Sequence, residues 1–119
     1  MDVILSIKPE YISKIFDGIK TIELRKVIFK QKVGRVYIYA TNPIKKIVGY
    51  FYIKNICYDT AANLGDKYKK YKNSIFRYFQ NTKGYVIEIS EIHKFDKFIN
   101  PYDFYDKFIP PQNFIYIKK

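Results

Sequence analysis

Four charged residues near the N-terminus have the types and spacing to bind a polar ligand. Lys8 precedes a proline, and Lys20, Glu23 and Arg25 follow within the stretch GIKTIELRK, residues 18–26. The alternation of a β-strand would place Glu23 and Arg25 on one face. A lysine and an arginine beside a carboxylate can hold a phosphate while the carboxylate accepts a hydrogen bond from a base edge. The alternative is surface ion pairing, where each pair contributes only ~0–1 kcal/mol, and from the residues alone it is the simpler interpretation.

A second candidate segment is GDKYKKYKNSIFRYFQNTKG, residues 65–84, where basic and aromatic residues interleave. Basic groups bind phosphates, while aromatic faces stack exposed bases at about 1–3 kcal/mol per base. The alternative is a solvated lysine loop whose tyrosines pack against the rest of the domain. We expect this segment to attract nucleic acid through Lys67, Lys69, Lys70, Lys72, Arg77 and Lys83.

The net charge of the whole chain also favours a nucleic-acid partner. Lysine and arginine total 22 against 11 acidic residues, a formal net charge of +11 over 119 residues. Such an excess favours polyanionic partners, nucleic acid above all. Only Arg25, Arg35 and Arg77 are arginines, and the other basic residues are lysines, which have AT-rich codons. Part of the basic charge can therefore reflect genome composition.

Cysteine use and hydropathy indicate the compartment. Cys57 is the only cysteine, so an intrachain disulfide is impossible and a reducing setting is expected. The N-terminus does not resemble a signal peptide, and no stretch approaches the roughly 18 apolar residues that span a bilayer. We expect a soluble cytoplasmic protein.

Local patterns predict the elements that position the four charged residues. Residues 3–7 (VILSI) read as a short strand, and Pro9 suits the first position of a helix. Ile12 and Ile15 have helical spacing, and Gly18 lies where a C-terminal cap is expected. Lys8 and the stretch that follows Gly18 thus flank one short helix.

The remaining pattern predicts an α+β domain over residues 1–119. Gly49, inside a long apolar strand, indicates a bulge or a close approach to the backbone. We expect a small, mostly antiparallel β-barrel of about five to seven strands, flanked by two or three helices. Further strands are expected at residues 20–26, 35–40, 45–57, 84–95 and the end of 110–118. A second helix is expected at residues 73–81. Residues 59–72 are expected to form a loop with one helical turn, and residues 96–108 are expected to be rich in turns.

The N-terminal stretch LSIKPEYISKIFDGIKTIELRK resembles the start of ASCH domains, where a strand ends in Lys-Pro and a helix leads to Gly-x-Lys-x-x-Glu-x-Arg. Later stretches match weakly but in the family's order: GRVYIYAT, KKIVGYFYI, GYVIEI and PPQNFIYI. The resemblance implies a PUA-like barrel with a cleft between the barrel and its helices. It also implies RNA binding, with hydrolysis of RNA or nucleosides in some small members. With this resemblance we favour a ligand pocket lined by Lys8, Lys20, Glu23 and Arg25.

The resemblance also bears on catalysis. One small ASCH enzyme, an N4-acetylcytidine amidohydrolase, has a Lys-x-x-Thr motif and a distant glutamate. Lys20 matches the lysine, but Glu23 stands where that enzyme has its threonine nucleophile, and Thr21 is adjacent rather than equivalent. The group that would form an acyl intermediate is therefore missing. Glu88 could be the distant acid, although a solvent-facing strand residue is the simpler interpretation.

Other chemistry finds little support. His93 is the only histidine and there is no second cysteine, so neither a structural zinc site nor any other cofactor is expected. A Cys57–His93 pair is formally possible, but a small core residue at the end of a strand is the simpler role for Cys57.

We therefore predict an RNA- or modified-nucleotide-binding module with a charged cleft at the barrel mouth. One alternative is a small hydrolase that acts on RNA or acylated nucleosides, with Lys20 and Glu23 as its proton-transfer groups. Another is a protein-interaction module in a transcription or translation complex.

Overall fold

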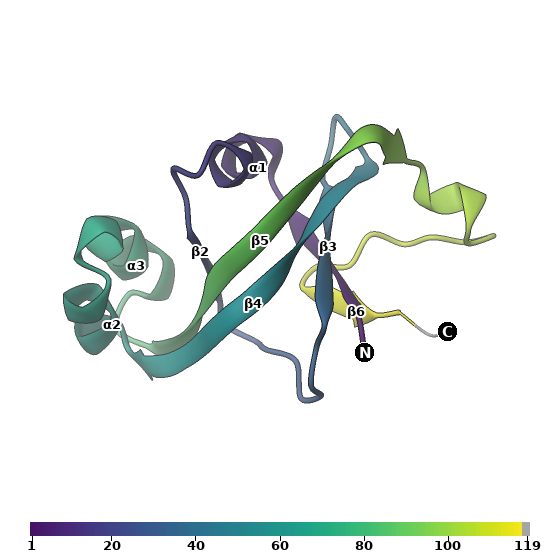
Figure 1. Cartoon of the computed structure of the whole chain (residues 1–119). Coiled ribbons are helices and arrows are strands. Elements are labelled where there is room, and N and C mark those ends of the chain that lie inside the picture. Colours follow the sequence, from purple (N-terminus) through teal and green to yellow (C-terminus); the bar gives the residue numbers. More distant parts are fainter. Residues whose placement is uncertain (118–119) are drawn as a thin grey trace.

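Six strands form one curled sheet in the order β2–β5–β4–β3–β1–β6 (Figure 1). The computed structural model describes residues 1–117. Neighbours β1 and β3 run parallel, and the other four neighbouring pairs are antiparallel. The sheet forms a half-barrel with β2 and β6 at its edges, which confirms the predicted mostly antiparallel fold and shows that the barrel is open. The strands are β1 (Val3–Ile7), β2 (Ile22–Arg25), β3 (Arg35–Ala40), β4 (Lys46–Thr60), β5 (Lys83–Ile99) and β6 (Phe114–Tyr116).

Helices lie at two places around the sheet. Helix α1 (Pro9–Phe16) follows β1, whereas α2 (Ala61–Lys67), the 3-10 turn η1 (Lys69–Tyr71) and α3 (Lys72–Phe79) connect β4 to β5. Figure 1 shows α2 and α3 together at one end of the long β4–β5 ribbon. A second 3-10 turn, η2 (Pro101–Asp103), follows β5 near the other end.

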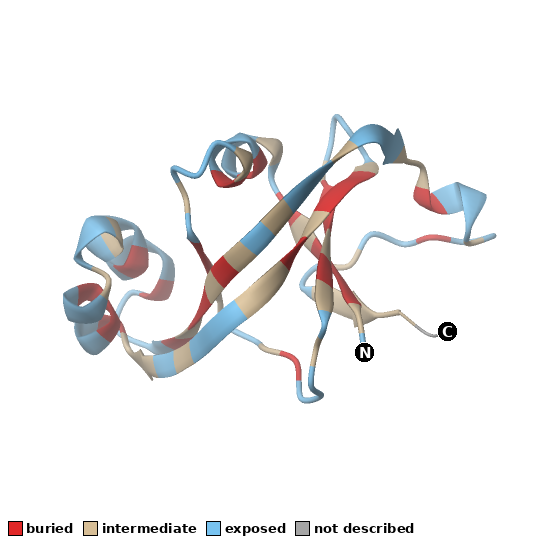
Figure 2. Ribbon diagram, viewed as in Figure 1, coloured by how far each residue is buried: buried red, intermediate tan, exposed pale blue. Residues whose placement is uncertain are grey.

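The main core fills the space between the sheet and α1. Ile12 and Ile15 of α1 pack there against Leu5, Val36 and Phe51 of three strands. Figure 2 shows the buried residues of α1 turned toward the sheet while its other face is exposed. The helical spacing of apolar residues after Pro9 therefore positions α1 as predicted, with the start of the helix at Pro9 itself.

A bulge at Gly49 confirms the prediction made from that glycine. The β3–β4 register skips one residue of β4, because Ile38 pairs with Gly49 whereas Tyr39 pairs with Ile47. A Cβ atom on Gly49 would clash with the carbonyl oxygen of His93 on β5. Glycine is therefore required because another strand passes directly against its backbone.

The expected loop over residues 59–72 is wrong, since α2 and η1 occupy most of it. The Thr60 hydroxyl accepts a hydrogen bond from the Asn63 amide at 3.2 Å and so caps α2, as N-terminal threonines commonly do. Ala61 and Leu64, one turn apart, are buried against α3 and β5. Tertiary burial thus completes a helix that contains a glycine at residue 65.

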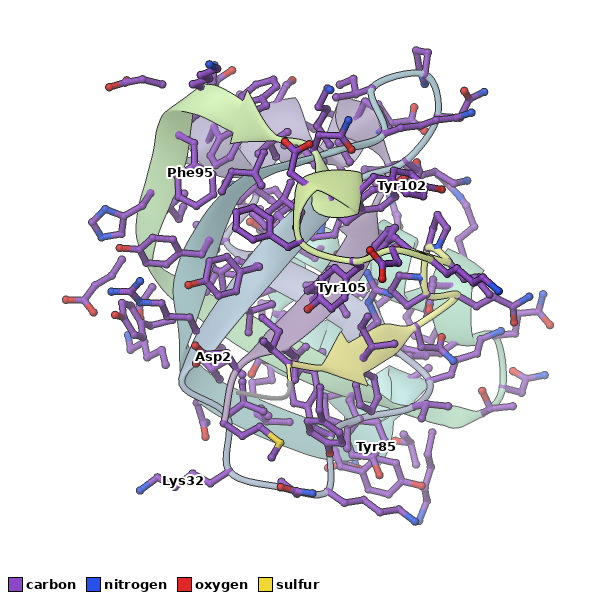
Figure 3. All side chains as sticks on the ribbon, turned by 90° about the vertical axis from the view of Figure 1, so that its right-hand side faces the viewer. Asp2, Lys32, Tyr85, Phe95, Tyr102 and Tyr105 are labelled. Carbon is purple, nitrogen blue, oxygen red and sulfur yellow. The ribbon has the colours of Figure 1, made fainter. Side chains whose placement is uncertain are left out.

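The strand that begins near residue 84 is longer than predicted. Strand β5 continues to Ile99, so the turn-rich segment begins later than residue 96. The segment after η2 covers the outer face of the sheet, where Phe108 packs on Tyr39 with ring centroids 5.2 Å apart; Tyr105 of this segment lies in front of the strands in Figure 3. Strand β6 confirms the predicted terminal strand, and its last expected position, residue 118, lies outside the described residues, as does residue 119.

Within residues 1–117, none of the helices has the length and apolar character needed to cross a membrane.

Candidate ligand-binding cleft

The end of α1 determines where Lys20 lies. The Ile19 amide donates to the Lys14 carbonyl at 2.9 Å, and the Gly18 amide donates to the Ile15 carbonyl at 3.1 Å. These two bonds form a Schellman cap, which requires a left-handed residue, and Gly18 has a φ of 75°. The Lys20 amide also donates to the Lys14 carbonyl, at 3.0 Å. The chain therefore turns sharply and leads Lys20 directly into β2.

Strand β2 brings Glu23 into a buried position at the edge of the sheet. Its register pairs Glu23 with Ile87 and Arg25 with Tyr85 of β5. Among the residues described, Glu23 is the only charged residue classed as buried. A buried carboxylate needs partners, since an unpaired buried charge is strongly destabilising.

Lys20 and Arg25 supply those partners, one on each carboxylate oxygen. The Lys20 ammonium donates to Glu23 Oε1 and the Arg25 guanidinium to Glu23 Oε2, both at 2.6 Å. Each cation also donates to a backbone carbonyl: Lys20 to Ile22 at 2.7 Å and Arg25 to Ser6 at 2.8 Å. The side chains of Lys20, Glu23 and Arg25 are only 16%, 8% and 11% exposed. The ion pairing considered as the alternative is present, but these pairs are not surface pairs.

The two cations keep Glu23 ionised. Burial by itself raises the pKa of the Glu23 carboxyl, but the adjacent charges of Lys20 and Arg25 and their hydrogen bonds outweigh it. The pKa of Glu23 is therefore lowered from its usual value. At neutral pH the three side chains form a fixed group, here called the charged triad, with one net positive charge.

A cleft of about 780 Å³ opens beside the charged triad. It is bordered by α1, β2, η1 and α3, and by the segment around Pro111. The four residues predicted to form a pocket all line it: Lys8, Lys20, Glu23 and Arg25. The spacing of the N-terminal motif therefore brings these four together, as expected.

The 3-10 turn η1 is hydrogen-bonded to the loop that carries Lys20. The Tyr71 hydroxyl accepts a hydrogen bond from the Thr21 amide at 2.8 Å and donates to the Ile19 carbonyl at 3.1 Å. The Lys70 ammonium donates to the same carbonyl at 3.1 Å. These contacts make η1 one wall of the cleft.

The predicted nucleic-acid contacts of residues 65–84 separate into three groups. Lys70 and Arg77 line the large cleft. Lys67 and Lys69, again with Lys70, line a second cavity of about 330 Å³. Lys72 and Lys83 line neither cavity.

Sequence analysis missed two large side chains of the cleft, Tyr11 and Lys14. A signal for both was present, because Lys8, Tyr11 and Lys14 are spaced by three residues, so the N-cap residue Lys8 and the two α1 residues lie on one side of the helix. Tyr78 is one of the aromatic residues that interleave with basic residues in the segment 65–84, but its place in this cleft depends on how α3 docks. Burial raises the pKa of the Tyr78 hydroxyl, so this group stays protonated at neutral pH.

Contacts at and beside the second cavity correct the expectation for Glu88 and add to that for Cys57, which packs against the core as expected. The Tyr68 hydroxyl lies 2.6 Å from Glu88 Oε2 and 3.0 Å from Cys57 Sγ, and the Lys67 ammonium lies 2.9 Å from the same sulfur. Glu88 is thus bound by a tyrosine and is not simply solvent-facing, and Cys57 is more than a core residue. Burial and these partners raise the pKa of the Tyr68 hydroxyl.

The Cys57–His93 pair is wrong. Cys57 pairs with Val86, whereas His93 pairs with Tyr50, seven residues away along β4. At about 3.3 Å per residue the two side chains are far apart.

Comparison with known proteins identifies the family. The model of the ASCH domain family matches residues 5–114. The chain belongs to the ASCH domain family. It is 26% identical over 130 residues to an ASCH domain-containing ribonuclease of Zymomonas mobilis, with 99% of this chain and 85% of the relative covered.

Solved ASCH structures have the same fold. A crystal structure of ASCH from Zymomonas mobilis superposes with a TM-score of 0.87 at 25% identity, covering 99% of this chain and 88% of that one. A point-mutant crystal structure of the same protein gives a TM-score of 0.88 at 24% identity, covering 99% and 91%. Both the resemblance and the PUA-like half-barrel that it implied are therefore confirmed.

Proposed function

We propose that this ASCH domain binds RNA or a modified nucleotide in its large cleft, and the charge of the cleft walls carries the proposal. Six cationic residues and a single carboxylate line it. Within residues 1–117, the ion pairs that form are the two made by Glu23, to Lys20 and to Arg25. No carboxylate of the described residues therefore pairs with the remaining cleft cations, which are Lys8, Lys14, Lys70 and Arg77.

The charged triad contains one buried donor without a partner in the described part of the chain. This donor is Nε of Arg25, a residue that lines the cleft. A buried donor left unpaired costs about 1–3 kcal/mol. A ligand oxygen could remove this cost only if the side chain moved to expose Nε, and such a movement would favour ligands rich in acceptors, such as phosphates and nucleobases.

The size and aromatic content of the cleft fit a nucleotide. Small-molecule sites enclose roughly 300–1,000 Å³, and about 780 Å³ is within that range. Tyr11 and Tyr78 line the cleft and are 41% and 40% exposed, so their rings are accessible for stacking.

The name of the Zymomonas mobilis relative, a ribonuclease, supports RNA over other polyanions. Binding is favoured over hydrolysis by the state of Glu23. A general base works best with a pKa near the operating pH, whereas the Glu23 carboxylate has a lowered pKa and both of its oxygens are occupied. It is better suited to hold Lys20 and Arg25 in place than to move a proton.

Fluorescence anisotropy with labelled single-stranded RNA at several salt concentrations tests this proposal. Lys14→Gln and Arg77→Gln remove exposed cleft cations outside the charged triad. Each should weaken binding and reduce the slope of log K against log salt by about 0.7 per lost phosphate contact. Lys97→Gln, the same charge change on exposed β5 outside the cleft, is the matched control and should leave the slope nearly unchanged. No binding at low salt, or binding indifferent to salt, would contradict the proposal.

Hydrolysis of RNA or acylated nucleosides is the second candidate, favoured by the name of the relative and by the Lys20 ammonium at the cleft. Incubation of both substrates with wild type and Lys20→Ala decides it, with circular dichroism to show that the variant is folded. Turnover by wild type that Lys20→Ala loses would support catalysis. Equal turnover by both proteins, or none by either, argues against it.

A further inference from the structure

A row of aromatic side chains crosses three strands on the outer face of the sheet. Tyr37 of β3 pairs with Tyr50 of β4, which in turn pairs with His93 of β5. Directly paired residues project on the same face of a sheet, so the three rings lie side by side. In the next row, Arg35 of β3 pairs with Tyr52 of β4.

These side chains form a layered stack. The Arg35 guanidinium carbon lies 4.5 Å from the centroid of the Tyr50 ring. The His93 ring is 4.6 Å from Tyr50, centroid to centroid, and inclined by only 18°. Because β4 lies between β3 and β5, Tyr50 is held between the cation and the imidazole. His93 is exposed and forms the outer end of the stack.

Neutral groups hold Arg35 in this stack. Its Nε donates to the Tyr52 hydroxyl at 3.1 Å and its Nη1 to the Tyr37 hydroxyl at 3.4 Å. The Asp2 carboxylate accepts a hydrogen bond from the backbone amide of Arg35, at 2.8 Å, and not from its guanidinium. Among residues 1–117 no carboxylate forms an ion pair with this guanidinium. The side chain is therefore fixed in position with its positive charge uncompensated.

Core packing does not account for the rings of Tyr50, Tyr52 and His93. Val36 and Ile38, which alternate with Arg35 and Tyr37 along β3, fill the core on the other face of the sheet. On the outer face, Tyr37 packs against the cluster around Phe108, as does Phe95 of β5, whose position on the ribbon is labelled in Figure 3. The rings of Tyr50, Tyr52 and His93 are not part of that cluster, and they line neither cavity.

We propose that this outer face binds the unpaired bases of single-stranded RNA, with a base on the free face of the His93 ring and a phosphate on Arg35. A fixed cation among aromatic rings matches the alternation of phosphates and bases along a single strand. The free side of His93 is open because β2 pairs with β5 only as far as Glu88. This surface is separate from the cleft and does not depend on ligand binding there. The surface, called the aromatic array, comprises Arg35, Tyr37, Tyr50, Tyr52, His93 and Phe95.

Proton NMR of the single histidine tests the proposal at its location. His93 is the only histidine, so the carbon-bound protons of its ring give one set of signals. On titration with an oligouridylate at constant pH, a base stacked on the ring should shift these signals upfield until binding saturates. Tyr50→Ala removes the ring that supports His93 and should weaken binding about tenfold, the loss of one stacking interaction.

Two further variants separate stacking from charge and from general effects. Arg35→Gln keeps the tyrosines and should lower both the affinity and its salt dependence. Tyr58→Ala is the matched control, because Tyr58 is 56% exposed and belongs to another aromatic pair across β4 and β5, with half-buried Tyr85 at 4.5 Å between centroids. It should leave binding unchanged.

The outcomes distinguish this proposal from that for the cleft. If Arg77→Gln weakens RNA binding while the His93 signals do not move, the aromatic array is not an RNA site and the cleft proposal stands. If the His93 signals shift and Tyr50→Ala weakens binding while both cleft variants bind normally, the array stands and the cleft proposal fails. If the signals instead shift with protein concentration alone, and Tyr50→Ala lowers the sedimenting mass, the face is a self-association surface and the proposal is overturned.

Discussion

The charged triad and the aromatic array each hold an arginine in place, but they neutralise it differently. Arg25 is mostly buried and bound to a carboxylate, so its charge is balanced inside the protein. Arg35 is held on an open face by two tyrosine hydroxyls and a ring, so its charge remains for another molecule. The comparison indicates that the triad mainly builds the cleft, whereas the array offers its cation directly.

The largest expected effect is the loss of the triad's carboxylate. Glu23→Ala leaves Lys20 and Arg25 partly buried and unpaired, and we expect it to lower the free energy of unfolding by about 3–5 kcal/mol. Urea denaturation followed by circular dichroism measures this. Asp96→Ala, which removes an exposed acid from β5, should change the value by less than about 0.5 kcal/mol. Similar losses in the free energy of unfolding for both variants would contradict a specific contribution of the charged triad to stability.

A matched pair of arginine variants tests the comparison directly. Arg25→Gln removes hydrogen bonds to a charged group and should destabilise the fold by about 1.5–3 kcal/mol. Arg35→Gln removes a cation–π contact on an accessible face and should cost less than about 1 kcal/mol. Equal losses in urea denaturation would contradict the distinction between a structural and an available arginine.

Acid should weaken the charged triad. The pKa of Glu23 is lower in the folded protein than its value of about 4.3 in an unfolded chain. The ionised carboxylate therefore contributes stability above that pH, and the contribution is lost as the pH falls through the lowered folded pKa. Denaturation from neutral pH to strongly acidic pH should show the gap between wild type and Glu23→Gln narrowing.

The last prediction concerns the hydrogen bonds that join η1 to the loop carrying Lys20. Tyr71→Phe removes the hydroxyl that joins the Thr21 amide to the Ile19 carbonyl and should cost about 1 kcal/mol. Hydrogen exchange followed by NMR should show faster exchange of the Thr21 amide. Unchanged exchange there would mean that η1 is held to the cleft by other contacts.

Sequence patterns predicted those parts of the molecule whose geometry is local. The helical spacing after Pro9, the cap at Gly18 and the short distance from Lys20 to Arg25 leave few ways to fold this stretch. The four predicted pocket residues accordingly line one cleft. Whether they bind a ligand stays a prediction.

Features that depend on contacts between distant segments were not predicted. Glu88 meets Tyr68 only because α2 folds back onto β4 and β5. The aromatic array depends on strand order and on the registers of the β3–β4 and β4–β5 pairings, which place Tyr37 and His93 beside Tyr50. In the sequence these tyrosines were indistinguishable from core residues, because β4 has apolar side chains on both faces.

The position of β1 has a consequence for the order of folding. This strand is made first during synthesis, yet one of its neighbours is β6, the last strand described, and the other is β3, which it joins in parallel. Pairings between the two ends of a chain form slowly, because a long loop must close before any contact compensates for its lost entropy. Without β6, β1 is therefore an open edge of the half-barrel, and it stays open until β6 has left the ribosome. A chain stalled before β6 would present β1, apolar on both faces, as an exposed edge on which other chains can pair and aggregate.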